Sequence, residues 1–488
     1  MKNLRLLAIF AIWLTLVLAL TACGGSSGDN ANDGDASSND NQTTTATTPV
    51  SPVEPADPGI HTPRDLGGGT ITFGGWWEGV LPFAPTNPDW EPDPATSGNY
   101  LIDRMIWDNA RRVEQEFNIS FYHNIIYYHD NIPLLTASVM AGDPISDIQM
   151  LSGGMTLNAV VGNLIHPLDT INLPGSDILG ANVFAHIVSS GMGHDWTFID
   201  NQPDPHGTSL GVNLDIINAI GAPNPVELYN QGRWGWNEMM EIMRMATQDT
   251  TGDGIIDQFG IAGQPSYITM HLVGGNDGEV MSPDFQFYFD SPNTMQALEF
   301  AESIFLEGLW QYDRSGNPNI YDWGLNFWAY LEGRSALFVT ATWALQDGQP
   351  SFDYAVVPFP TGPANTSGNT WLTGWVQGLA LPAGSAWAPS DLLMIAEELY
   401  SWPGSDPGLM MEGGMGWPRQ ILPTEECVQR QLSTPRTRNS QIAMSVPHYS
   451  WFFTMLTSNM VSQEMGLLPF IEAHRAPQQE LLDAIFAD

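Results

Sequence analysis

The sequence predicts an α/β protein with two large lobes, on the basis of its length, its composition and its alternating strand and helix patterns. The 488 residues correspond to about three domains of ~150 residues, or to two large lobes with appendages. Hydrophobic residues make up 43% of the chain and charged residues only 14%, which is typical of a folded globular body. Only Cys23 and Cys427 are present, so the fold must rest on core burial and not on disulfides.

Strand and helix patterns alternate along the chain from about residue 69. Short runs of alternating or continuous apolar and β-branched residues predict strands at residues 70–73, 119–122, 147–151, 336–339 and 354–357. Apolar residues three and four apart predict helices at residues 101–117, 134–141, 216–220, 236–247 and 294–306. This alternation indicates βαβ units, and therefore mostly parallel sheets flanked by helices.

The N-terminus has the features of a secretory signal over residues 1–22, with basic residues before an apolar run. Leu20-Thr21-Ala22-Cys23 resembles the bacterial lipobox, which implies that Cys23 carries diacylglycerol. The alternative, a retained transmembrane anchor, is disfavoured because the apolar run is shorter than the ~20 residues that a span needs. Residues 23–68 are rich in Ser, Thr, Asn, Asp, Gly and Pro, which predicts a flexible tether. We therefore expect an extracytoplasmic protein, lipid-anchored to the bacterial cell membrane on its outer face or in the periplasm.

The chain is strongly acidic. Fifty-four Asp and Glu residues against 15 Lys and Arg residues give a formal net charge of −39. A field of this sign repels phosphate backbones, so nucleic-acid binding is excluded as a function class.

Five short segments carry a family resemblance when they are taken in order: residues 141–148, 211–215, 234–238, 331–337 and 357–360. They are similar, in that order, to a small-Gly-Asp-Pro stretch, a Tyr-Asn-Lys-Asp segment, a Trp-Thr-Trp-Asp-Glu helix start, a Gly-Lys-Ala-Ala-Met element and a proline-rich strand end. This set resembles the extracellular solute-binding proteins of ABC importers, specifically the carbohydrate-binding group of family 1 type. In the second segment Val212 and Leu214 replace the family's tyrosine and lysine. The resemblance covers roughly residues 67–400.

This resemblance implies a two-lobed periplasmic-binding-protein-like fold of type II, with a ligand cleft at the hinge between the lobes. Lobe 1 is expected over residues 69–205 plus about 370–425, and lobe 2 over residues 206–369 plus about 426–488. The implied function is capture of a sugar or oligosaccharide and its delivery to an ABC transporter permease, without catalysis. A monomer that requires no cofactor is expected.

A sugar presents an apolar C–H face and a ring of hydroxyls, so its receptor needs aromatic platforms beside polar groups. The candidate platforms are tryptophans at strand ends or in loops: Trp76, Trp77, Trp343, Trp371 and Trp375. The candidate hydroxyl acceptors are Glu78 and Asp195. A candidate source of backbone N–H donors is the pair Ser152 and Gly153. The competing interpretation is that the tryptophans fill cores or lobe interfaces.

A surface-tethered glycoside hydrolase is the alternative function. It would need two carboxylates about 5 to 10 Å apart around one glycosidic bond, and Glu78 and Glu412 are candidates, Glu412 being a candidate ligand contact as well. A purely structural adhesin is a third possibility, and it predicts no response to small ligands.

Residues 249–257 resemble an EF-hand calcium loop. Side-chain oxygens stand at positions one, three, five and nine and a backbone carbonyl at position seven, which makes the candidate ligands Asp249, Thr251, Asp253, Asp257 and Ile255. Gly260 occupies position twelve, where the pattern needs a bidentate glutamate. The loop is therefore either a structural calcium site or an Asp/Gly-rich surface turn.

Overall fold

The structure is a computed structural model that describes residues 59–76, 91–94, 100–174, 183–185, 194–200, 208–311, 328–368, 377–402, 404, 406–433 and 449–486. The chain separates into a unit of residues 1–54 and a unit of residues 55–488, and every described residue belongs to the second unit. Several sequence predictions lie outside the described residues: the signal peptide and Cys23, most of the tether, and the site candidates Trp77, Glu78, Trp371 and Trp375.

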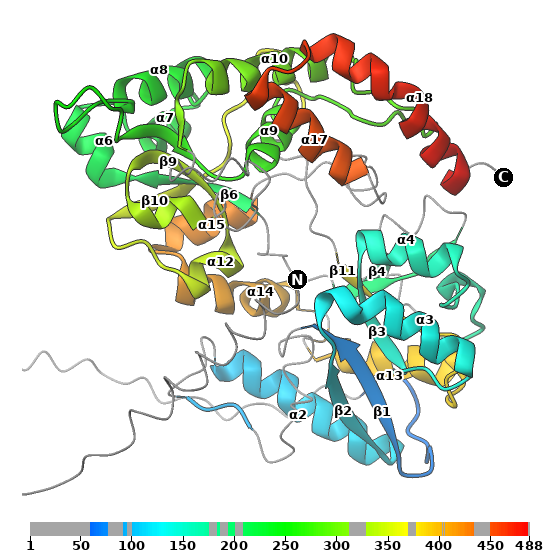
Figure 1. Ribbon diagram of the computed structural model, residues 1–488. Coiled ribbons are helices and arrows are strands. Elements are labelled where there is room, and N and C mark those ends of the chain that lie inside the picture. Colours follow the sequence, from blue (N-terminus) through cyan, green and yellow to red (C-terminus); the bar gives the residue numbers. More distant parts are fainter. Residues whose placement is uncertain are drawn as a thin grey trace, which may run out of the picture. The chain divides into compact units, whose positions relative to one another are not determined.

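Six described strands form the first sheet, in the order β2-β1-β3-β11-β5-β4 (Figure 1). β1 pairs in parallel with β2 and β3, whereas β11 runs antiparallel to β3 and β5, and β4 antiparallel to β5. The bounds of these strands are β1 Gly69–Gly75, β2 Ile119–Ile125, β3 Ile148–Ser152, β4 Val183–Ala185, β5 Phe198–Asp200 and β11 Gln377–Ala380.

Helices cover both faces of the first sheet. Successive side chains of a strand point to opposite faces, and those of β3 enter two different cores. On β3, Ile148 and Met150 pack in one core with α2 (Tyr100–Phe117) and α13 (Pro389–Tyr400). Leu151 packs in another core with residues of α3 (Asn131–Ala141) and α4 (Gly153–Val161). The 3-10 helices η2 (Tyr128–Asp130) and η3 (Leu168–Thr170) complete this part.

Five described strands form the second sheet, in the order β10-β6-β9-β7-β8. β7 is parallel to β8 and β9, and β6 is antiparallel to β9 and β10. Their bounds are β6 Thr208–Asn213, β7 Phe259–Ala262, β8 Trp310–Gln311, β9 Ser335–Ala341 and β10 Tyr354–Val357. The accompanying helices are α6 Leu214–Ile220, α7 Pro225–Asn230, α8 Trp236–Ala246, α9 Pro265–Gly274, α10 Pro292–Leu306, η4 Ala329–Glu332, α12 Thr342–Asp347, α14 Pro407–Ile421, α15 Glu425–Ser433, α17 Tyr449–Ser462 and α18 Leu467–Phe486.

Both sheets are mixed and not mostly parallel as the sequence predicted, because β4 and β11 in the first sheet and β6 in the second run antiparallel to their neighbours. The chain builds β1 to β5 in the first sheet and β6 to β10 in the second, and then comes back to the first sheet for β11. α15 packs on β10, and α17 packs on α9 and α10, so the C-terminal helices belong with the second sheet. Met415 and Ile421 of α14 also pack in a core with Phe338 and Tyr354 of that sheet. The predicted boundary near residue 425 had assigned this helix to lobe 1.

Each segment predicted from periodicity overlaps an observed element of the same type. The two glycines that follow the predicted strand of residues 70–73 would be expected to form a turn, but Gly74 and Gly75 are the last two residues of β1. Space explains the glycine at 74, because a Cβ there would lie 2.2 Å from Gln149 Oε1. Among the described residues, no helix is both long enough and apolar enough to cross a bilayer.

Candidate functional site

The carboxyl ends of β1, β2 and β3 meet at one edge of the first sheet. Their parallel register pairs Gly75 with Ile125, and Phe73 with Ile148. In open α/β sheets, ligands bind beyond this edge, where the segments that follow the strands converge. The segments that follow β1, β2 and β3 carry Trp76, Tyr128 and Gly153, respectively.

Tyr128 brings two of the predicted site residues together. Its ring stands edge to face with Trp76, with centroids 5.2 Å apart and an interplanar angle of 84°. Its hydroxyl lies 3.3 Å from Ser152 Oγ. Tyr128 was not among the predicted site residues, although it lies just after the second predicted strand, as Trp76 lies after the first. Trp76 and Tyr128 are both half-buried.

Ser152 and Gly153, the predicted source of backbone N–H donors, lie in regular elements and not in a loop. Ser152 ends β3 and Gly153 begins α4, so the strand passes directly into the helix. The Ser152 side chain makes no capping bond to α4, and its carbonyl accepts a hydrogen bond from Thr156 Oγ1 at 3.0 Å. The first-turn N–H groups of a helix have no intrahelical acceptor. Gly153 at the start of α4 can therefore offer its backbone N–H group as a donor.

Asp195 lies in a small acidic group before β5. Its N–H donates to Asp169 Oδ1 at 3.3 Å, and His194 Nδ1 lies 3.0 Å from Asp169 Oδ2. Burial raises the pKa of Asp195, the charge of Asp169 raises it further, and His194 partly offsets both. The next residue, Trp196, packs on the same core as Trp76 and Tyr128. Asp195 is thus the sequence neighbour of a tryptophan that packs in the same core as Trp76 and Tyr128.

The second sheet carries its own candidates at the carboxyl ends of its strands. Trp343 lies in α12, directly after β9, and its half-buried ring stands edge to face with Trp328 at 6.3 Å. Gln264 lies in the short connection between β7 and α9, directly before α9. Its side chain is 3% exposed, and its Oε1 has no hydrogen-bond partner among the described residues. Gln264 was not among the predicted site residues, because no sequence pattern marks a buried glutamine.

Glu412 is engaged in an ion pair. Its Oε2 lies 2.6 Å from Arg419 Nη1, and the same guanidinium bonds Glu425 through Nε at 2.9 Å. Both carboxylates of this triad are partly exposed. Glu412 therefore has a structural partner within its own part of the chain, and the structure does not bring it to any other predicted site residue that it describes.

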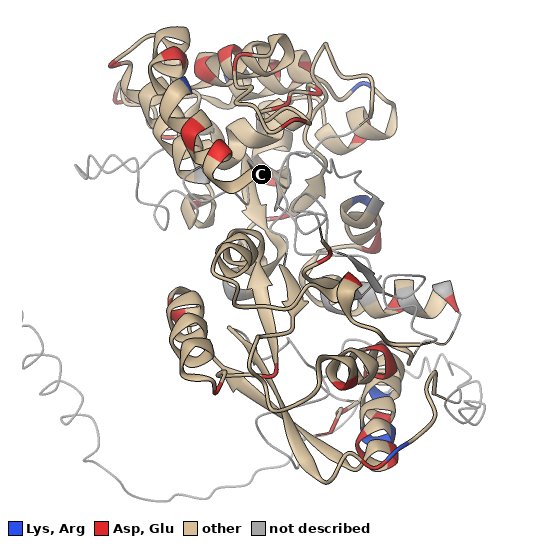
Figure 2. Ribbon diagram, turned by 90° about the vertical axis from the view of Figure 1, so that its right-hand side faces the viewer, with Lys and Arg blue, Asp and Glu red and all other residues tan. Residues whose placement is uncertain are grey.

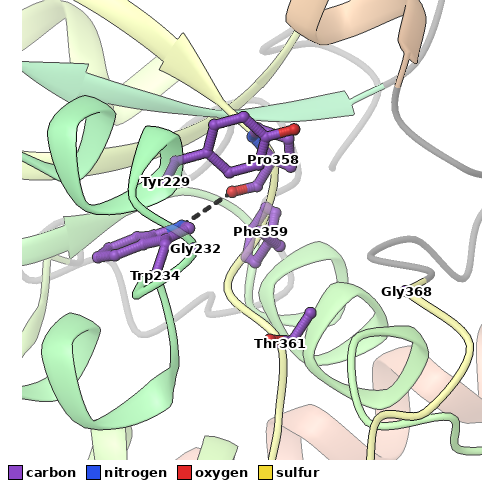
Figure 3. A pocket seen from close by; sticks show the side chains of 7 residues that line it. All are labelled: Tyr229, Gly232, Trp234, Pro358, Phe359, Thr361 and Gly368. Carbon is purple, nitrogen blue, oxygen red and sulfur yellow. Dashed lines mark hydrogen bonds between the residues drawn. The ribbon is translucent and has the colours of Figure 1, made fainter.

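A separate pocket of about 190 Å³ lies beside the edge strand β10 (Figure 3). Trp234 Nε1 donates to the carbonyl of Pro358 at 3.0 Å and joins two of its walls. None of the predicted site residues lines it. Its lining residues are Tyr229, Gly232, Trp234, Pro358, Phe359, Thr361 and Gly368.

The loop over residues 249–257 closes on itself. The Asp249 carboxylate accepts N–H bonds from Gly254 at 2.6 Å and Gly252 at 2.7 Å, and these bonds lower its pKa. The Asp257 carboxylate accepts two bonds from Thr250. Within the described ranges, no group of three or more His, Cys, Asp or Glu side chains is placed to hold a metal ion. Calcium binding at this loop stays a prediction.

Acidic side chains are spread over many helices and loops of the described chain, and basic ones are few (Figure 2). The few arginines are used locally. Arg104, Arg111 and Arg112 of α2, for example, all pair with carboxylates close by. Within the described part of the chain, the arginines therefore form no cationic surface that would suit a polyanionic partner.

No protein-family model and no curated protein matches the chain, but solved structures do. An extracellular solute-binding protein from Staphylococcus aureus in complex with maltose has a TM-score of 0.56 at 14% identity, over 87% of this chain and 100% of that chain. The sugar-binding protein MalE from Xanthomonas citri has a TM-score of 0.56 at 13% identity, over 85% and 98%. This chain has their fold.

A third match supports the same assignment. The maltose/maltodextrin-binding domain MalE from Bdellovibrio bacteriovorus bound to maltotriose has a TM-score of 0.53 at 11% identity, over 86% of this chain and 100% of that chain. The predicted α/β, two-lobed, type II periplasmic-binding-protein-like fold is therefore confirmed. At such low identities the likeness establishes the fold, and the ligand is a separate question.

Proposed function

We propose that the chain is a non-catalytic receptor that captures a sugar or oligosaccharide outside the cytoplasm and delivers it to the permease of an ABC transporter. The observation that carries this proposal is the contact of Trp76 with Tyr128, and of Tyr128 with Ser152, at the carboxyl edge of β1 and β3. The fold supports it, since it is shared with proteins whose structures hold maltose and maltotriose.

The chemistry of this edge suits a sugar ring. Half-buried aromatic rings offer flat apolar surface to the C–H face of a pyranose. The Ser152 hydroxyl and the Asp195 carboxylate offer hydrogen-bond partners to its hydroxyls, and bonds to charged groups are the stronger kind, worth about 1.5 to 3 kcal/mol each. Trp76, Tyr128 and Ser152 thus combine stacking surface with polar groups within one contact network.

The second lobe supplies further aromatic surface. Trp451 in α17 is 53% exposed, the largest exposure of any tryptophan among the described residues. α17 packs against α9, whose N-terminal end follows Gln264. An exposed indole ring presents an apolar face on which a sugar ring can stack. We therefore propose Trp451 and Trp343 as the aromatic contacts of lobe 2.

Sugar titration of the full mature chain tests the function. We expect maltose, maltotriose or a related oligosaccharide to change tryptophan fluorescence saturably, and to be recovered chemically intact. Cleaved sugar would establish the hydrolase alternative instead. The absence of any response across a broad sugar panel would contradict the receptor.

Matched variants locate the site. We expect Trp76→Ala and Trp451→Ala each to weaken sugar binding roughly tenfold, the cost of losing one aromatic anchor. Trp387→Phe is the control, because Trp387 packs at the opposite end of β1, against Gly69, where its Nε1 bonds the carbonyl of Thr70 at 3.3 Å. Equal losses in all three variants would indicate general damage to the fold.

The lipid anchor is a part of the proposal with its own test. Diacylglycerol at Cys23 would hold the protein at the membrane as a monomer on a tether. We expect Cys23→Ala to move the protein from the membrane fraction to the soluble fraction without changing its sugar affinity. Retention of this variant in the membrane would favour an uncleaved anchor.

A further inference from the structure

Three polar side chains are buried together between the first sheet and α3. Ser146, Gln149 and Asn131 are each 1% exposed or less. Ser146 Oγ donates to Gln149 Oε1 at 2.6 Å, and Gln149 Nε2 donates to Asn131 Oδ1 at 3.1 Å. Buried amides cost free energy unless they are bonded, and apolar side chains of the same size would fill the space without needing partners.

β1 is shaped to admit this group. Gly74 lies within the strand, and a Cβ at that position would stand 2.2 Å from Gln149 Oε1 and 2.8 Å from Ser146 Oγ. Its backbone does not have a positive φ. The glycine is therefore required by space, and the space it leaves is filled by the amide of Gln149.

Asn131 connects the buried group to the candidate site. It follows η2 directly, and its backbone N–H donates to the carbonyl of Tyr128. The Tyr128 hydroxyl is at the other end of the residue, 3.3 Å from Ser152 Oγ. The tyrosine is thus held at both its main chain and its hydroxyl, with its ring against Trp76.

The second polar atom of the Asn131 side chain is a buried donor. Its Nδ2 is buried and has no hydrogen-bond partner among the residues that the structure describes. An unsatisfied buried donor is destabilising. If Asn131 served stability alone, a leucine of similar size would serve better, because it has no donor to satisfy. The presence of an asparagine is therefore better explained by the hydrogen bond that its Oδ1 accepts from Gln149.

We propose that the buried Gln149–Asn131 pair positions the Tyr128 ring in the sugar site, which makes Asn131 and Gln149 positioning residues for ligand binding. This inference rests on the proposed function. The chain of contacts runs from Gln149 on β3 through Asn131 at the start of α3 to the turn that carries Tyr128. Misplacing an aromatic contact reduces affinity although the contact itself is still present.

Affinity measurements on the full mature chain test the proposal, with maltotriose as the probe. We expect Asn131→Leu, and independently Gln149→Met, to weaken binding roughly five- to tenfold, the net value of a hydrogen bond or a well-placed ring. The melting temperature of Asn131→Leu should change little, because the substitution also removes the unsatisfied donor. Unchanged affinity in both variants would overturn the proposal.

A double-mutant cycle separates positioning from general damage. In a Tyr128→Ala background, Asn131→Leu should weaken maltotriose binding less than about twofold further, because its effect passes through the tyrosine. Multiplication of the two single effects would overturn the proposal. Gln478→Met in α18 is the control: Gln478 is also buried, at 6% exposure, and its Oε1 also lacks a partner among the described residues. It should leave affinity unchanged.

Hydrogen exchange in the ligand-free protein keeps this test distinct from the test of function. The backbone amides of residues 128–131 should exchange faster in Asn131→Leu and Gln149→Met than in the wild type or Gln478→Met. Faster exchange in a protein that binds no sugar would support the positioning and contradict the function. Unchanged exchange would overturn the positioning whatever the protein binds.

Discussion

Arg112 Nη2 lies 2.7 Å from Oε2 of Glu398, and the side chain of Glu398 is fully buried. The other oxygen of this carboxylate accepts the backbone N–H of His61 at 2.5 Å, and His61 Nε2 lies 2.5 Å from Glu397 Oε2. Residues 59–68, predicted as the end of the tether, are therefore bonded to α2 and α13.

Removing the buried carboxylate should destabilise the protein strongly. We expect Glu398→Ala to lower the free energy of unfolding by about 3 to 5 kcal/mol, because it leaves Arg112 partly buried without this counter-ion. Urea denaturation measures the loss. Glu116→Ala is the matched control, since Glu116 pairs with the same guanidinium at 2.5 Å but is 35% exposed, and it should cost less than about 1 kcal/mol. Similar losses in both variants would contradict the role of burial.

Asp277 should stabilise the protein only above acidic pH. Burial raises the pKa of Asp277, but hydrogen bonds from Ser367 and Thr366 outweigh it and hold the pKa below the usual 3.8. The unfolded state therefore binds more protons just below pH 3.8, so this contribution is complete above that pH and is lost as the pH falls through the folded-state pKa.

The test is the free energy of unfolding as a function of pH for the wild type and Asp277→Asn. We expect the wild type to be more stable by a constant amount above about pH 5, and this difference to shrink as the pH falls below 3.8. A difference that stays the same at every pH would show that the ionised carboxylate does not matter.

Gly211 on β6 makes room for an aromatic ring on the neighbouring strand. A Cβ at Gly211 would lie 2.1 Å from the ring of Phe338, which is fully buried and stacks on Tyr330 with centroids 5.1 Å apart. We expect Gly211→Ala to lower the free energy of unfolding by about 1 to 3 kcal/mol through overpacking. Combining it with Phe338→Leu should cost less than the sum of the two single changes, because the smaller side chain relieves the clash.

Gly466→Ala is the control for this prediction. A Cβ there would make only ordinary contact, 3.6 Å from Pro469, so its effect should stay within about 0.5 kcal/mol. Urea denaturation of all four variants decides the matter. Strict additivity of Gly211→Ala and Phe338→Leu would argue against a direct clash.

If residues 249–257 bind calcium, we expect calorimetric titration with calcium to release or absorb heat, and calcium to raise the melting temperature. Both effects should be lost in Asp253→Ala. The loop is also held without a metal by the bonds to Asp249 and Asp257, so chelators should not unfold the protein. The absence of both heat and thermal shift would eliminate the calcium site.

Local patterns were enough to predict many elements but not their partners. The apolar stripe of residues 101–117 identifies α2, because one buried face repeats every three to four residues. The alternation at residues 70–73 identifies β1 in the same way. Neither pattern indicates that β3 pairs with β11, which lies more than two hundred residues later in the chain. Strand order is a long-range property that periodicity does not encode.

The candidate site shows the same division. Trp76 could be proposed from its place after a strand, since ligand-binding residues gather at such ends in α/β sheets. Tyr128 could not be joined to it, because their contact depends on the parallel register of β1 and β2. Glu412 was a candidate by residue type alone, and only the fold revealed that Arg419 already holds it.

Residue order and composition were thus sufficient for the α/β class, the acidic charge and many of the strands and helices, because these depend on spacings within a few residues. The three-dimensional packing determined which strands are neighbours, why Gly74 lies inside a strand, and how Gln149, Asn131 and Tyr128 come into contact. Such contacts join residues far apart in sequence, and their free energy exists only once the sheet has assembled.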